Sequence, residues 1–377
     1  MTFHIEIIIN FALFLNADVK LYYFTSMLKR SFFYVAVALA FAACTNTDVI
    51  EENEASGAII GFNSHVSNST RAITMENFKK FFVYGGYTPK DQSDYHTVFN
   101  GVAVSKDADK WTYEGASKYW VENATYKFYA YSCENIALSK GTPSFTTSGV
   151  DAGTFKITDF ECNDGHQHDL IFAESASIVA KETGNSEVSL SFKHILSKVK
   201  AVFKSGFDSD FTIKISEVEF RNVYDKADFS SKTNEWGNQT RSIAYNEAAS
   251  EWTKVTLPLE GSDNTIQAAK PAGSEGGDAV AAKELTTGTG YVLPVAYSSS
   301  DVTLSFKIEV KQGADVIKTD YVKGNIQPTW ALGTSYTYNV TVNGSAAGVE
   351  KIEFSVDATN GLQDWTESPV TDFNIGG

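Results

Sequence analysis

The chain has 377 residues, a formal net charge of −15, 13% aromatic residues and three cysteines. The acidic balance argues against a nucleic-acid partner, because phosphate binding needs a basic face. It is typical instead of a protein that stays soluble outside the cell. The aromatic content, with frequent Ser, Thr, Asn and Gly, favours β-strands and turns over helices.

A secretory signal is recognisable near the N-terminus. Met27–Arg30 is a short basic start, residues 31–43 carry no charge, and two alanines precede Cys44. These are the parts of an export signal, and the apolar run is too short to span a bilayer. We therefore predict a lipoprotein whose mature chain begins at lipidated Cys44 and is anchored by its acyl chains to the outer membrane.

Two features of this region depart from a simple signal. Phe41 stands three positions before the cysteine, where Leu is usual, so a signal-anchor helix or a cleaved signal with an incidental cysteine is the alternative. We interpret residues 1–43 as a misannotated extension plus the signal peptide, with Met27 as the true start. The polar, acidic residues 44–56 then form a flexible tether.

From residue 58 onward, apolar and polar residues alternate in short runs separated by small polar residues. This period of two predicts antiparallel strands with one solvated face. A slip of phase within residues 213–220 predicts a bulge. Phe81–Tyr84 is expected to end in a turn at Gly85 and Gly86. The clearest alternating runs are 188–192, 302–310 and 336–342.

The expected fold class is all-β, with two antiparallel β-sandwiches in tandem. Residues 267–290 lack periodicity and predict a long loop. A softer break at 180–186 marks the domain boundary, so we place an N-terminal sandwich at 57–185 and a C-terminal sandwich at 186–377.

Catalytic motifs are not recognisable, and we expect that the protein is not an enzyme and needs no cofactor. G-x-S-x-G, H-E-x-x-H and P-loop patterns do not occur. The richest polar cluster, Asp164–Asp169, includes His166 and His168, which are residue types that bind metals. It directly precedes an apolar strand, so we interpret it as a polar turn and predict no metal site. A surface hydrolase with an unrecognised carboxylate pair stays an alternative.

Two further groups of residues leave alternatives open. Cys133 and Cys162 would form a disulfide after export or lie as buried thiols. The tryptophans would provide a platform for sugar rings if they were exposed, although core packing is the commoner role. They are Trp111, Trp120, Trp236, Trp252, Trp330 and Trp365.

The order of several short motifs resembles the fimbrillin-like family, the lipoprotein-derived pilins and adhesins of type V pili. After Cys44 come the strand Ile59–Phe62 and the Thr70–Ala72 element, which is similar to the family's "TRA". Leu190–Val199 is similar to its F-x-H-x-L-S-K-V strand. The resemblance covers residues 44–365, and the order of the motifs makes it specific. Further matches are Phe81–Gly85, Tyr119–Trp120, Tyr126–Tyr131, Asp169–Ala173 and Trp330–Tyr336.

The resemblance implies a pair of transthyretin-like sandwiches and a role as a cell-surface pilus (fimbrial) subunit or adhesin. In the family, a protease cleaves after an Arg beyond the first strand, which corresponds to the Arg71–Ala72 bond. Loss of the lipidated strand opens a groove, and a strand from another subunit then fills it. Ile60 and Phe62 would occupy that groove before cleavage.

The C-terminus leaves the role within a pilus open. Val370, Phe373 and Ile375 would make a short donor strand, but Pro369 and the final glycines weaken it. Stalk, tip and anchor roles therefore remain alternatives, and an exposed turn is the alternative for Arg71. The runner-up function is a non-polymerising, lipid-anchored surface protein that binds glycans. The implied partners are other pilin subunits and a host or bacterial surface glycan or protein.

Overall fold

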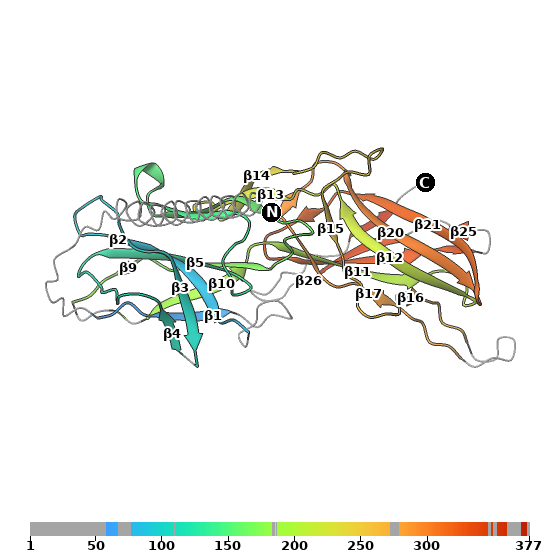
Figure 1. The fold of residues 1–377 in the computed structure, drawn as a ribbon, viewed down its shortest axis with the longest axis horizontal. Helices are drawn as coiled ribbons and strands as arrows, with labels where there is room; N and C mark the ends of the chain where they lie inside the picture. Colours follow the sequence, from blue (N-terminus) through green and yellow to red (C-terminus); the bar gives the residue numbers. More distant parts are fainter. Residues whose placement is uncertain are drawn as a thin grey trace, which may run out of the picture. The chain divides into compact units, whose positions relative to one another are not determined.

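The computed structural model describes residues 58–66, 77–108, 110–182, 185, 187–271, 279–345, 348–349, 353–359 and 371–374. Over these ranges the chain consists of β-strands, turns and one 3-10 turn at Gly149–Asp151, without an α-helix (Figure 1). The all-β prediction is therefore confirmed. In the same ranges, no helix has the length and apolar character needed to cross a bilayer.

The first sheet has eight strands and follows the order β1-β10-β8-β5-β2-β3-β4, with β9 paired to β5. Its edges approach each other, because the ring of Phe62 in β1 lies 6.2 Å from that of Tyr113 in β4. The strand bounds are β1 Phe62–Val66, β2 Lys80–Thr88, β3 His96–Asp107, β4 Lys110–Tyr113, β5 Thr125–Cys133, β8 Leu170–Glu174, β9 Ile178–Val179 and β10 Val188–His194.

A four-stranded sheet, in the order β14-β13-β7-β6, packs on one face of the first sheet. Phe172 of β8 lies between the two sheets, 5.7 Å from the Phe155 ring and 5.1 Å from the Phe229 ring. The strands are β6 Thr142–Thr146, β7 Thr154–Glu161, β13 Lys226–Ser230 and β14 Glu235–Thr240. The opposite face of the first sheet carries its own apolar core, which includes Ile60 and Phe62.

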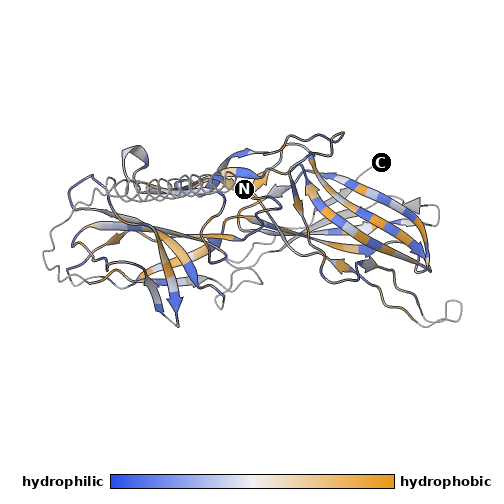
Figure 2. Cartoon of the chain, viewed as in Figure 1, coloured by the Kyte–Doolittle hydropathy of each residue, from blue (hydrophilic) through white to orange (hydrophobic). Residues whose placement is uncertain are grey.

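Two further sheets enclose another core. A six-stranded sheet (β17-β11-β23-β26-β27, with β18 beside β11) faces a five-stranded sheet (β15-β12-β20-β21, with β16 beside β12). The Phe203 ring of β11 lies 4.9 Å from the Phe306 ring of β20 across the core. Figure 2 shows the alternation of polar and apolar residues along β20.

The strands of these sheets are β11 Ser197–Ser205, β12 Phe211–Arg221, β15 Lys254–Thr256, β16 Thr265–Ile266, β17 Leu285–Thr286, β18 Gly290–Val292, β20 Val302–Gln312, β21 Asp315–Ile326, β23 Ser335–Val342, β26 Glu353–Thr359 and β27 Thr371–Asn374. Two small two-stranded sheets complete the set. They pair β19 Val295–Ala296 with β22 Thr329–Trp330, and β24 Gly344–Ser345 with β25 Gly348–Val349.

Strand pairing crosses the predicted division at residues 185 and 186. β10 lies after it and pairs with β1 and β8, which lie before it. The β13–β14 hairpin also lies after it, and β13 pairs with β7. The contacts unite residues 57–377 in one unit. The division into 57–185 and 186–377 therefore stays a prediction, and the polar stretch that suggested it is the connection between β9 and β10.

Two local features of the strands were predicted, a bulge and a turn. The bulge is confirmed, because the β12–β20 register shifts between Ser216 and Glu219. The turn at Gly85–Gly86 was wrong, since β2 runs through both glycines to Thr88. A Cβ on Gly86 would lie 1.9 Å from the carbonyl oxygen of His96. The glycine therefore allows the close approach of β3 and does not end the strand.

The long loop expected over residues 267–290 contains paired backbone. Isolated bridges join Gln267 to Lys283 and Lys270 to Val280. β17 lies within the same stretch and pairs with β11. These pairs involve short segments with little side-chain alternation, which is why the periodicity did not reveal them.

Candidate functional site

The strand β1 joins the first sheet through a parallel pairing with β10, in a register that runs from Phe62 opposite Val188 to Val66 opposite Phe192. The residues just before β1 are held by main-chain bonds on their other side. The Ile60 amide donates to the Lys118 carbonyl at 2.8 Å, and the Trp120 amide donates to the Ala58 carbonyl at 3.2 Å. The segment from residue 58 to residue 66 thus lies between two neighbouring pieces of chain.

Side chains of this segment fill the core of the first sheet. Ile60 is 0% exposed and Phe62 is 2% exposed. Both side chains are thus buried, but the strand expected at Ile59–Phe62 begins only at Phe62, and Ile60 lies in the extended segment before it. Their role in filling a groove stays a prediction. The Phe62 ring packs edge-on against four aromatic rings, namely those of Phe81, Phe99, Tyr113 and Phe128.

Most of the other predicted site residues lie outside the described residues. The exception is Phe373, which lies in β27, where it is paired with Phe354 of the antiparallel neighbour β26. The proposed donor segment thus includes an edge strand of the six-stranded sheet. The residues outside the described ranges are Cys44, Arg71, Ala72, Trp365, Val370 and Ile375.

The polar cluster at Asp164–Asp169 leads into β8, as predicted, but its last residue is buried. Oδ1 of Asp169 lies 2.9 Å from Nδ1 of His194, and the Asp169 amide donates to Oε1 of Glu134 at 3.0 Å. His168 Nδ1 lies 3.0 Å from the other oxygen of Glu134. His194 was not identified from the sequence as a partner of Asp169. A charged residue directly before the apolar run Leu170–Ala173 was the signal that would have found it.

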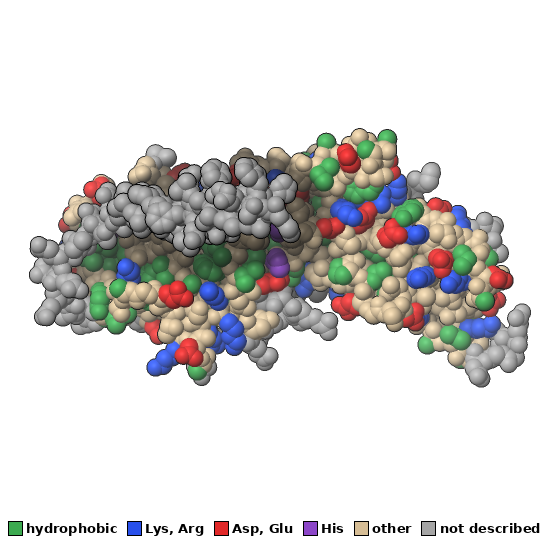
Figure 3. All heavy atoms as spheres, in the orientation of Figure 1, with side chains coloured by type: hydrophobic (Ala, Val, Ile, Leu, Met, Phe, Trp, Pro, Cys, Tyr) green, Lys and Arg blue, Asp and Glu red, His purple; other side chains and the backbone are tan. Residues whose placement is uncertain are grey.

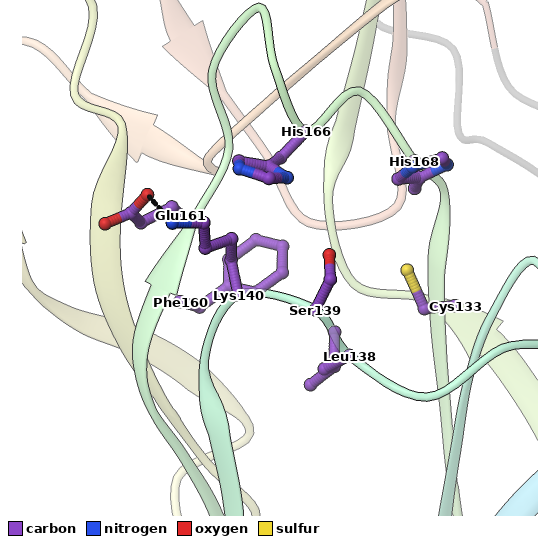
Figure 4. Close-up of a pocket in the computed structure, with 8 residues that line it drawn as sticks. All are labelled: Cys133, Leu138, Ser139, Lys140, Phe160, Glu161, His166 and His168. Atoms are coloured by element: carbon purple, nitrogen blue, oxygen red, sulfur yellow. Dashed lines mark ion pairs between the residues drawn. The ribbon is translucent and has the colours of Figure 1, made fainter. Parts of the chain in front are cut away.

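His166 and His168 do not form a metal site with their neighbours. They line a cavity of about 10 Å³ together with Cys133 and Phe160 (Figure 4). That volume holds about one water molecule. In the described part of the chain, no group of three His, Cys, Asp or Glu side chains is placed to hold a metal ion.

The cysteine question is settled in favour of buried thiols. Cys133 and Cys162 are both free and buried. The Cys162 thiol donates to the Tyr291 carbonyl at 3.2 Å. Burial raises the pKa of Cys133 to about 12 and also raises the pKa of Cys162, so both thiols stay protonated at neutral pH.

The tryptophans do not form an exposed platform in the described part of the chain. Trp120, Trp236 and Trp330 are buried, whereas Trp111 and Trp252 are half-buried. Two of the buried indole N–H groups have partners inside, since Nε1 of Trp236 donates to the Ile195 carbonyl at 2.5 Å and Nε1 of Trp330 donates to the Tyr338 hydroxyl at 2.9 Å. A sugar platform built from tryptophans alone is therefore not supported.

Comparisons with known proteins agree with this architecture. A family model described as Fimbrillin-like matches residues 70–360, which is more than half of the chain. The fold is similar to the crystal structure of a fimbrial protein from Bacteroides vulgatus, at a TM-score of 0.50 and 14% identity, over 80% of this chain and 98% of that chain. A candidate cell adhesion protein from Bacteroides ovatus is similar at a TM-score of 0.45 and 15% identity, over 85% and 100% of the two chains. No curated protein matches the chain by sequence.

Proposed function

The chain belongs to the fimbrillin-like family, and from this premise we propose that it is a cell-surface fimbrial subunit or adhesin that assembles by strand exchange. The proposed role is structural and requires no catalysis by this chain. The observation that carries the proposal is the way in which β1 fills the core of the first sheet.

Loss of β1 would leave a groove with strong affinity for another strand. The core would lose Ile60 and Phe62, and four aromatic rings would lose their common neighbour. β10 would lose the main-chain partner that runs beside it from Val188 to Phe192. Exposed apolar side chains next to unpaired backbone groups are the conditions under which a sheet accepts an added strand.

Ser64 of β1 gives a specific reason why another strand could replace β1 in the groove. Ser64 is 4% exposed, and in the part of the chain that the structure describes its hydroxyl has no hydrogen-bond partner. An unsatisfied buried hydroxyl costs roughly 1–3 kcal/mol. A strand with an apolar side chain at this position would therefore bind the groove more tightly than β1 does.

The proposed sequence of events begins at the membrane. The lipid on Cys44 holds the precursor at the outer membrane, and a protease then cuts between Arg71 and Ala72, beyond the C-terminal end of β1. The cut releases the lipid together with Ile60 and Phe62. The emptied groove then accepts a strand from another subunit. Stalk, tip and anchor subunits differ in which of these steps they complete. A neighbouring subunit supplies a C-terminal donor strand that contains the residues equivalent to Val370, Phe373 and Ile375.

Intact-mass analysis of the chain recovered from membranes and from surface appendages tests this proposal. We expect a lipidated chain that starts at Cys44 in the membrane and a chain that starts at Ala72 in the appendage. Arg71→Ala should stay lipidated and absent from high-molecular-weight ladders. Lys90→Ala, which removes a basic side chain from an exposed turn, should assemble normally. Normal assembly of Arg71→Ala would show that the strand-exchange proposal is wrong.

A further inference from the structure

The outer face of the five-stranded sheet carries exposed aromatic rings. Tyr321 of β21 is 47% exposed and Tyr245 is 44% exposed, while Trp252 is half-buried. Tyr245 and Trp252 come from the segment between β14 and β15, which crosses this face. We call Tyr245, Trp252 and Tyr321 the aromatic surface. Figure 3 shows hydrophobic, basic and acidic side chains intermixed over β12, β20 and β21.

Hydrogen bonds hold the two tyrosine rings in place. The Tyr321 hydroxyl donates to Oε2 of Glu217 at 2.6 Å, and Nζ of Lys307 lies 5.6 Å from the centre of the ring. The Tyr245 hydroxyl donates to Glu247, whose other oxygen accepts from Lys323 of β21. These carboxylate bonds raise the pKa of both tyrosines. The Glu247–Lys323 pair also ties Tyr245 to the strand that carries Tyr321.

The tryptophan is supported from beneath. The Arg221 guanidinium lies 4.2 Å from the centre of the Trp252 ring. Nε of Arg221 donates to Oε1 of Glu219 at 2.5 Å, and Lys254 binds the other oxygen of Glu219 at 2.9 Å. Arg221 and Glu219 are each 7% exposed. The charged pair fills the space below the indole, so the ring cannot sink into the sheet.

Fixed rings surrounded by donors and acceptors suit a sugar. The C–H faces of a pyranose pack on aromatic rings, and its hydroxyls need both donors and acceptors. Rings that are already held in place lose little conformational entropy when a ligand binds. A protein-binding surface would be expected to lack charges at its centre, whereas each ring here is in contact with a charged group.

The charges near the rings nearly balance, which bears on the class of sugar. The basic groups are Arg221, Lys254, Lys307 and Lys323, and the acidic groups are Glu217, Glu219 and Glu247. Each of these side chains is already paired with an opposite charge, so none is left to bind an anionic sugar. We propose that the aromatic surface binds a neutral glycan. This site does not depend on strand exchange, because it lies on a different sheet from β1.

Binding of the full chain to printed neutral, sialylated and sulfated oligosaccharides tests the proposal. We expect binding to at least one neutral glycan and weaker binding to its sialylated form. Tyr245→Ala and Tyr321→Ala should each lower the affinity about 3- to 10-fold, because each removes one stacking ring. Tyr245→Phe and Tyr321→Phe keep the rings and should retain most of the affinity. Tyr119→Ala removes a tyrosine of equal exposure, 44%, from the region of the first sheet and should have no effect.

A measurement on the unaltered chain guards against variants that unfold. Tetranitromethane modifies exposed tyrosines, and the bound neutral glycan should protect Tyr245 and Tyr321 but not Tyr119. Absence of binding to every neutral glycan would overturn the proposal. Equal loss of binding in Tyr119→Ala, tighter binding of sialylated glycans, or protection that spares Tyr245 and Tyr321 would overturn it as well.

Discussion

Nδ1 of His194 and Oδ1 of Asp169 lie 2.9 Å apart, where the chain leaves the first sheet for the next. The two residues are 3% and 0% exposed. His194 ends β10, and Asp169 directly precedes β8. The next residues are also held, since the Ile195 amide donates to the Leu170 carbonyl at 3.0 Å. The pair therefore fixes the crossover by which β10 reaches β11.

Removal of the carboxylate should destabilise the chain strongly. We expect Asp169→Ala to lower the free energy of unfolding by about 3–5 kcal/mol, because one member of a buried pair is lost. Asp169→Asn retains the size and a hydrogen-bonding oxygen and should cost less. His168→Ala breaks the pair with Glu134, in which both side chains are more than a third exposed, and should cost at most about 1 kcal/mol. Urea denaturation measures all three, and equal costs for Asp169→Ala and His168→Ala would contradict the role given to the pair.

Phe62 should contribute more to stability than any exposed residue of β1. Phe62→Ala removes a ring that is 2% exposed and packs against four others, so a loss of about 3–5 kcal/mol is expected. Asn63→Ala changes an exposed neighbour on the same strand and should stay within about 0.5 kcal/mol. Thermal unfolding monitored by near-ultraviolet circular dichroism compares the two. Similar melting temperatures for both variants would show that β1 is not part of the core.

Gly86 should not tolerate a side chain. Its Cβ would lie 1.9 Å from the carbonyl oxygen of His96, which is backbone and cannot rotate away. Gly86→Ala must therefore push β2 and β3 apart, at a cost of at least about 1–3 kcal/mol. A Cβ on Gly237 meets no atom within 4 Å, so Gly237→Ala is the matched control and should change stability little. Denaturant titration of both variants gives the comparison, and a tolerated Gly86→Ala would refute the tight packing of β3.

The two buried thiols should be unreactive until the chain unfolds. In a Cys44→Ser chain, only Cys133 and Cys162 remain of the three cysteines. Because the thiolate is the reactive form and burial keeps both thiols protonated, Ellman's reagent at about pH 8 should detect none in the native protein and both in urea. Rapid reaction of the native protein would contradict their burial.

The raised pKa of Cys133 also predicts a dependence of stability on pH. The thiol has a pKa of 9.0 when unperturbed and about 12 in the fold, chiefly because burial disfavours the thiolate. Between these values the unfolded chain loses a proton that the folded chain keeps, so unfolding becomes more favourable as pH rises. This stabilisation is complete below pH 9 and is lost between pH 9 and pH 12. The stability difference between the wild type and Cys133→Ala should therefore change over that window and stay constant below it.

Strand faces were predictable because they depend on local alternation. Phe62 lies on the buried face that its neighbours indicate, and the slip in phase before Phe220 marks a real bulge. The features that failed depend on distant chain. Gly86 was interpreted as a turn residue, because the residues around it in the sequence do not indicate that the carbonyl of His96 packs closely against it. The partners Asp169 and His194 stand far apart along the sequence, and only the fold brings them together.

The exposed rings were missed for a related reason. Composition shows that aromatic residues are abundant, but alternation cannot say which lie on the outside when they come from irregular segments. Tyr245 belongs to such a segment, and the exposed β21 that carries Tyr321 alternates weakly in burial. From the sequence, only the tryptophans were considered as a platform for sugar rings. Trp120, Trp236 and Trp330 are buried, and Trp252 packs against Arg221.

The parallel pairing of β1 with β10 has a consequence for the order of folding. Phe62 is opposite Val188, a separation of 126 positions (188 minus 62), whereas β2 pairs with β3, the next strand along the chain. Contacts that close a long loop form late, because the entropy of closure must be overcome first. When the chain emerges with its N-terminus first, β1 appears before the other strands of the first sheet. It cannot form its sheet pairing until β10 has also emerged. We therefore expect the first sheet to pass through a stage without its N-terminal strand every time the protein folds.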